Sequence, residues 1–163
     1  MIHKSLDQSR NWYTITTAID GSADYFYLNL TNQANASAVT VPTSDLMYFT
    51  SSAESNNNNE NYVVYMWHDV PGLQKFGGYT ANGAADGNFI ELGFRPAILW
   101  IKATGSYSPG NWFCHDAERD KFNPTAGDLQ LDRAQVEGNL GSAYYVDFLS
   151  NGFKLRANGN HRS

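Results

Sequence analysis

The sequence predicts an all-β protein, folded as an antiparallel β-sandwich, and three observations support this prediction. Apolar residues come in runs of about four to eight, the length of a typical strand. Clusters of Gly, Asn, Ser and Pro separate these runs. Almost no apolar residues recur at the spacing of three and four that marks an amphipathic helix. A chain of 163 residues is long enough to bury a substantial core in one such domain.

Each predicted strand is an apolar run bounded by turn-forming residues. In chain order, we expect strands at residues 11–16, 25–30, 46–50, 61–68, 89–92, 97–102, 112–115, 129–131, 144–149 and 153–156. Between the third and fourth of them, residues 51–60 are rich in Asn and Ser and contain nothing to bury. We expect an exposed loop there, and a linker between two domains is the alternative.

Two of the strands are apolar on both faces. In residues 62–67 and again in residues 98–101, successive side chains are apolar, although neighbouring side chains of a strand point to opposite faces. Such strands need cover on both sides. We therefore place both in the middle of a sandwich or under a neighbouring subunit, with Trp67 and Trp100 in the core.

The last two strands form a predicted hairpin. Asn151-Gly152 stands between two apolar runs, and Asn-Gly favours the positive φ angles of tight hairpin turns.

Three segments near the start of the chain resemble three segments of its last third, in the same order. Residues 2–7 resemble 114–119, residues 28–30 resemble 129–131, and residues 46–51 resemble 145–150. We therefore predict a single sandwich domain at residues 1–163, with incomplete repeat halves at 1–60 and 61–163. Such a chain would be a fragment of a longer repeating polypeptide. An alternative alignment pairs Asn11-Trp12 with Asn111-Trp112.

Composition and charge exclude several classes of protein. The formal net charge is −5, which gives no basic footprint for nucleic acid. Cys114 is the only cysteine, so no intrachain disulfide forms and the chain is expected to assemble in a reducing cytosol. No apolar run approaches the roughly 18 residues that cross a bilayer, so we expect no membrane insertion.

Few residues suggest chemistry. His68-Asp69 and His115-Asp116 are weak candidates for a metal site, and the competing reading is a histidine at a strand end with an aspartate that starts a turn. Cys114 and His115 are neighbours in one strand, so they point to opposite faces and do not form a nucleophile and base. Trp112, at a loop end, and Tyr107 are the aromatic residues that we expect to be exposed, and we expect both to bind a ligand together with Asn111.

Several motifs are similar to those of a known family. They include Tyr-Val-Val-Tyr-Met-Trp-His-Asp-Val-Pro-Gly at 62–72, Gly-Phe-Arg-Pro-Ala at 93–97 and Asp-Phe-Leu-Ser-Asn-Gly-Phe-Lys-Leu at 147–155. Together they resemble a domain of tail and virion proteins of marine bacteriophages, well over residues 62–156 and less well before them. The resemblance implies a concanavalin-like or jelly-roll sandwich without catalysis, serving virion structure or host-surface attachment.

We therefore expect a non-enzymatic structural module of a bacteriophage virion, in a tail fibre, a tail or a capsid-associated protein. Its expected partners are copies of itself or other virion proteins, and a host-surface glycan. Its expected location is the virion, after assembly in the cytoplasm of a bacterial host, and we expect no cofactor. The alternative is a carbohydrate-binding module for cell-surface glycans. A glycan-degrading enzyme would need a pair of carboxylates, for which the candidates are Asp86, Glu91, Asp116, Glu118 and Asp120.

Overall fold

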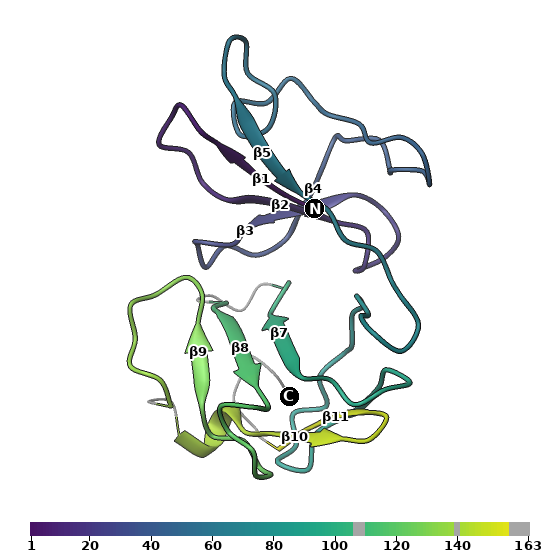
Figure 1. Ribbon diagram of the computed structural model, residues 1–163, viewed down its shortest axis with the longest axis vertical. Helices are drawn as coiled ribbons and strands as arrows, with labels where there is room; N and C mark the ends of the chain where they lie inside the picture. Colours follow the sequence, from purple (N-terminus) through teal and green to yellow (C-terminus); the bar gives the residue numbers. More distant parts are fainter. Residues whose placement is uncertain (106–109, 139–140, 157–163) are drawn as a thin grey trace.

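The computed structural model describes residues 1–105, 110–138 and 141–156 (Figure 1). The strands are β1 (Ile2–Ser5), β2 (Tyr13–Thr16), β3 (Asp24–Tyr27), β4 (Asn35–Ala36), β5 (Tyr62–Tyr65), β6 (Phe89–Glu91), β7 (Ile98–Lys102), β8 (Trp112–Asp116), β9 (Asp128–Gln130), β10 (Val146–Leu149) and β11 (Gly152–Leu155). The 3₁₀ turn η1 (Gly141–Tyr144) precedes β10. All strand pairs among the described residues are antiparallel, so the predicted all-β, sandwich-like fold is confirmed.

The N-terminal half contains a five-stranded sheet in the order β4-β3-β2-β1-β5. The pairing register places His3 beside Tyr13 on one face, and Ile2 beside Thr14 and Phe26 on the other. All five side chains are buried. The middle of this sheet is therefore covered on both sides.

A hydrophobic cluster covers the first face. Its buried members are Tyr13, Ile15, Ala23 and Val39, with Met1, Tyr25, Tyr27 and Tyr48 packed against them. Tyrosine rings of β2 and β3 contact one another at centroid distances of 5.2–6.0 Å. The segment after β4 closes this cluster without forming a strand of its own.

The C-terminal half contains two three-stranded sheets, β7-β8-β9 and β10-β11-β6 (Figure 1). Their facing side chains build a second cluster, made of Leu99, Ile101, Ala117, Val146, Phe148, Phe153 and Leu155. Leu99 and Ile101 come from β7, and the last four come from the hairpin β10–β11. These two sheets form a small sandwich of their own.

Trp112 joins the two halves. Its indole Nε1 donates a hydrogen bond to the carbonyl of Tyr27 at 2.9 Å, and its ring meets Phe26 edge to face at 5.1 Å. The ammonium of Lys102 lies 5.5 Å from the centroid of the same ring and donates to the carbonyl of Gly110. The start of β8 therefore packs against the second face of the five-stranded sheet.

Within the chain, residues 62–67 and 98–101 are not covered on both faces, so their predicted place in the middle of the sandwich is wrong, while the alternative of cover by a neighbouring subunit stays a prediction. The strands β5 and β7 lie at the edges of their sheets. Trp67 is 44% exposed and Trp100 is 50% exposed, so neither is a core residue. The strands covered on both faces are β1, β2 and β8, which include polar side chains and therefore lack a continuous apolar run.

The other strand predictions match the structure except at three places. Residues 46–50 form no strand, because Tyr48 and Phe49 reach the sheet from an irregular segment, where the ring of Phe49 meets His3 at 5.3 Å. The strands β1 and β4 were not predicted. Residues 51–60 form turns, and Glu60 at their end accepts hydrogen bonds from Ser5 and Arg10.

The hairpin is confirmed, but the reason for its glycine is different. Leu149 pairs with Gly152, so Ser150 and Asn151 form the turn. Neither Asn151 nor Gly152 has a positive φ angle. A Cβ atom on Gly152 would lie 2.1 Å from the carbonyl oxygen of Ile90, so β6 approaches too closely for any side chain here.

The predicted repeat has one structural counterpart. Residues 2–5 and 114–116 both lie in central strands, β1 and β8, and each strand contains a fully buried histidine. The other two pairs differ, because residues 28–30 form a turn and residues 46–51 form no strand, whereas their counterparts enter β9 and β10.

Candidate functional site

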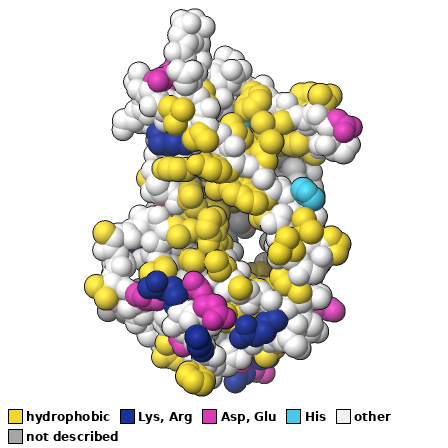
Figure 2. All heavy atoms as spheres, in the orientation of Figure 1, with side chains coloured by type: hydrophobic (Ala, Val, Ile, Leu, Met, Phe, Trp, Pro, Cys, Tyr) yellow, Lys and Arg dark blue, Asp and Glu magenta, His cyan; other side chains and the backbone are white. Residues whose placement is uncertain are grey.

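Exposed apolar side chains gather where the two halves meet. Figure 2 shows them as a band across the middle of the molecule, while many of the charged side chains on this face lie below it. Tyr65, Met66 and Trp67 at the end of β5, and Ile98 and Trp100 of β7, are all exposed. The described residues contain no helix that could span a membrane.

A groove of about 800 Å³ opens beside the end of β5. Its walls come from residues 15–18, residues 42–47 and residues 66–69, with Met1 and Phe76 completing them. The first wall follows from β2, the second belongs to the irregular segment that covers the first hydrophobic cluster, and the third leaves β5. Three segments far apart in the sequence therefore form one groove.

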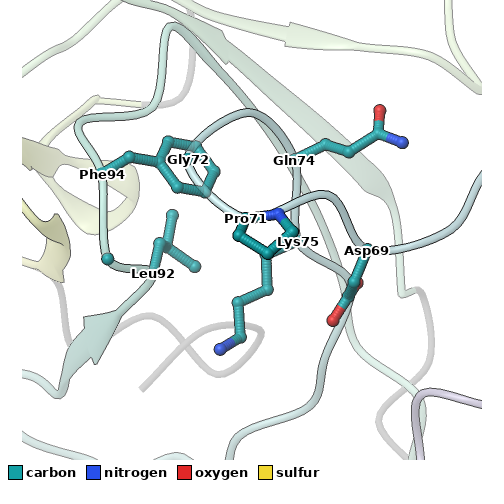
Figure 3. A pocket seen from close by; sticks show the side chains of 8 residues that line it. Asp69, Pro71, Gly72, Gln74, Lys75, Leu92 and Phe94 are labelled. Carbon is teal, nitrogen blue, oxygen red and sulfur yellow. The ribbon is translucent and has the colours of Figure 1, made fainter.

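A smaller pocket of about 250 Å³ lies between two turns (Figure 3). One side is the turn with Pro71 and Gly72, and the other is the segment with Leu92 and Phe94. The turn closes through a hydrogen bond from the Gln74 amide to the Val70 carbonyl at 3.0 Å. Gly72 has a φ of 78°, which glycine adopts without strain.

His68-Asp69 stabilises this loop. Nδ1 of His68 lies 2.8 Å from the Asp69 carbonyl, and Oδ1 of Asp69 accepts a hydrogen bond from the Phe76 amide at 2.8 Å. The carboxylate of Asp116 accepts from the amides of Glu118 and Arg119, so it too starts a turn. Among the residues whose structure is described, no cluster of three His, Cys, Asp or Glu side chains could hold a metal ion.

His115 and Cys114 are buried within β8. Their side chains point to opposite faces of the strand. Burial raises the pKa of the Cys114 thiol, which disfavours the thiolate that a nucleophile needs.

The expected exposure of Trp112 is wrong. Its side chain is buried at the junction of the two halves, and Asn111 beside it is buried as well. A buried indole leaves no face for a ligand to stack on. Tyr107 lies outside the described residues, so the structure places only two of the three predicted ligand-binding residues, and both are interior.

Four of the five carboxylates considered for glycoside hydrolysis have structural partners within the fold, namely Asp86, Asp116, Glu118 and Asp120. Asp86 lies 3.0 Å from the ammonium of Lys154 and 3.2 Å from Arg156, and these cations lower its pKa. Asp120 accepts hydrogen bonds from the amides of Ala126 and Gly127. Glu118, 76% exposed at its side chain, pairs with Lys121 at 3.7 Å.

Of the residues that line the groove, sequence reasoning singled out only His68 and Asp69 as site candidates, and those as metal ligands. Trp67 was expected in the core because its strand is apolar on both faces, and Asp45 had no feature that set it apart. The one signal in the sequence was the run Tyr65-Met66-Trp67, separated by three residues from the turn at Pro71-Gly72, where a strand ends and its last side chains extend beyond the sheet.

The whole chain, residues 1–163, matches one family model, described as Domain of unknown function (DUF7483). The chain belongs to this family. Neither a search of curated proteins nor a search of solved structures finds a match. For this DUF7483 domain, function is therefore argued from its own surface.

Proposed function

We propose that this domain is a non-enzymatic structural module of a bacteriophage virion that assembles with copies of itself and contributes to host-surface attachment. The observation that carries the proposal is the exposure of Ile98 and Trp100 on the edge strand β7. Exposed apolar side chains on an edge strand favour pairing with another chain.

The geometry of β7 favours a second copy as the partner. Ile98 and Trp100 share a face with Cys114 and Trp112 of β8, according to the pairing register. Phe26 covers the Trp112 end of this face, while the Trp100 end is exposed. Two β7 edges that pair antiparallel about a twofold axis would form one continuous sheet and bring the exposed side chains of both copies together on one face, where they cover part of one another.

The composition of the chain agrees with assembly. Only 17% of the residues are charged, and 14% are aromatic. Aromatic residues are enriched and charged residues depleted at the centres of protein interfaces. The resemblance of residues 62–156 to virion domains supplies the biological setting in this proposal.

Self-association tests the assembly. We expect sedimentation velocity at micromolar concentration to show a dimer, and the double change Ile98→Ser with Trp100→Ser to shift the sample to monomer. Truncation of buried apolar anchors removes most of an interface's affinity. We therefore expect the dissociation constant of the dimer to rise by about a hundredfold or more in the double variant.

Phe122→Ser provides the matched control, because Phe122 is 82% exposed and lies outside β7. This variant is expected to remain dimeric. A native chain that is monomeric throughout the micromolar range would contradict the proposal. Capsid or tail genes beside the coding sequence would support the virion setting, and metabolic genes there would count against it.

A further inference from the structure

The groove beside the end of β5 has the size of a ligand site and does not include β7. Its volume of about 800 Å³ lies within the range of roughly 300–1,000 Å³ typical of small-molecule sites. Its walls combine apolar side chains, such as Ile15, Met66 and Phe76, with the hydroxyl groups of Thr16, Thr43 and their neighbours.

Trp67 supplies an aromatic face that is held in place. Its ring lies nearly parallel to Tyr65, with an interplanar angle of 19° and a centroid distance of 6.1 Å. Tyr65 is not part of the groove wall, whereas Trp67 is. Stacking on Tyr65 restricts the rotamers of the exposed indole. Ligand binding therefore costs little conformational entropy of the Trp67 side chain.

The charges of the groove select the chemistry of its ligand. Of the described side chains that line it, none is Lys or Arg, and two are the aspartates Asp45 and Asp69. Asp45 is exposed, and Oδ2 of its carboxylate accepts from the Ser44 hydroxyl at 2.9 Å. Carboxylates accept hydrogen bonds and repel anions, so the groove favours a neutral ligand with many hydroxyl donors.

His68 adds a further acceptor. Its Nδ1 lies 2.8 Å from the Asp69 carbonyl, and a proton on Nδ1 leaves Nε2 of the neutral ring as an acceptor. An aromatic face, carboxylate and imidazole acceptors, and threonine hydroxyls therefore meet in one open groove. We propose that this groove binds a neutral oligosaccharide, with a sugar ring on Trp67 and sugar hydroxyls donating to Asp45.

Glycan binding in the groove does not depend on assembly through β7. One variant in the groove and one in β7 therefore test the two proposals separately. The probe is a panel of soluble neutral oligosaccharides, including hexose and N-acetylhexosamine chains, alongside sialylated and sulfated ones. We expect binding of neutral members by calorimetry, with about tenfold or greater weakening in Trp67→Ala. Trp100→Ala is the matched control, since Trp100 is similarly exposed but lies outside the groove, and this variant should retain glycan binding.

A second variant guards against misfolding of Trp67→Ala. Asp45→Ala alters only an exposed loop side chain, and we expect a similar loss of neutral-glycan binding. Binding confined to the anionic members, binding that survives both groove variants, or no binding in the panel would each overturn the proposal. Preference for a quaternary ammonium such as choline over every neutral sugar would overturn it as well, because aromatic rings also bind cations.

Discussion

The ring of His3 is fully buried in the five-stranded sheet. The rings of Tyr13 and Phe49 meet it edge to face at 6.0 and 5.3 Å. Burial, together with the positive amino group of Met1, lowers the pKa of His3 from 6.5 to about 4. A neutral imidazole therefore belongs to the folded state, and a charged one opposes it.

Acid should therefore destabilise the fold through His3. Below pH 6.5 the unfolded chain binds a proton that the folded chain does not bind until about pH 4. Stability is lost as the pH falls through this window, by about 3 kcal/mol in total. We expect urea unfolding at pH 7.5, 6, 5 and 4.5 to show this loss.

The change His3→Leu isolates the contribution of His3 to the loss of stability in acid. The variant removes the titrating group and keeps an apolar side chain at the site, so its stability should fall less steeply between pH 6.5 and 4. Parallel curves for the native chain and the variant would show that His3 does not contribute to the acid sensitivity.

At the scale of elements, the close approach of β6 to β11 explains why residue 152 is a glycine. The conformation of the turn does not require one there. Gly152 lies opposite Glu91 in the strand pairing, and the carbonyl of Ile90 approaches it so closely that no Cβ atom fits. The carbonyl is backbone, so it cannot move aside without breaking the pairing of the two strands.

Gly152→Ala should therefore destabilise the protein by about 2 kcal/mol or more, because β6 has to shift away from β11. Thermal and urea unfolding measure the loss. Gly77→Ala is the control, since nothing lies within 4 Å of a Cβ atom there, and its stability should stay within about 0.5 kcal/mol of native. Equal stability of the two variants would contradict the tight approach of β6.

At the scale of the whole molecule, two hydrophobic clusters lie in separate halves, and Trp112 connects them. The junction is small and aromatic, with Phe26 on one side and Lys102 over the indole. Removal of the ring would leave a cavity between the halves and remove the indole hydrogen bond to the Tyr27 carbonyl.

Trp112→Ala should cost about 3–5 kcal/mol of stability. We expect urea denaturation followed by far-UV circular dichroism to show an earlier midpoint, and the groove of the folded fraction to keep its affinity for oligosaccharide. Trp112→Phe keeps most of the ring and should cost clearly less. A stable Trp112→Ala variant that has lost glycan binding would restore the original expectation of a ligand site at Trp112.

The sequence alone predicts the fold class and the position of most strands, because strand-length apolar runs between Gly, Asn and Pro clusters are local properties. It also identified the turn roles of Asp69 and Asp116. Which strands are covered depends on tertiary packing. Alternation along a strand shows which side chains share a face, but the partner that covers a face comes from distant parts of the chain.

The candidate site depended on this second kind of information. Trp112 was expected to be exposed and is buried, because Phe26 and Tyr27 of a remote strand cover it. Trp67 was expected in the core and is exposed, because β5 lies at the edge of its sheet. The groove likewise requires residues 42–47 to lie against residues 66–69. Burial is a property of the packed molecule, so no local pattern could assign the core tryptophan and the exposed one.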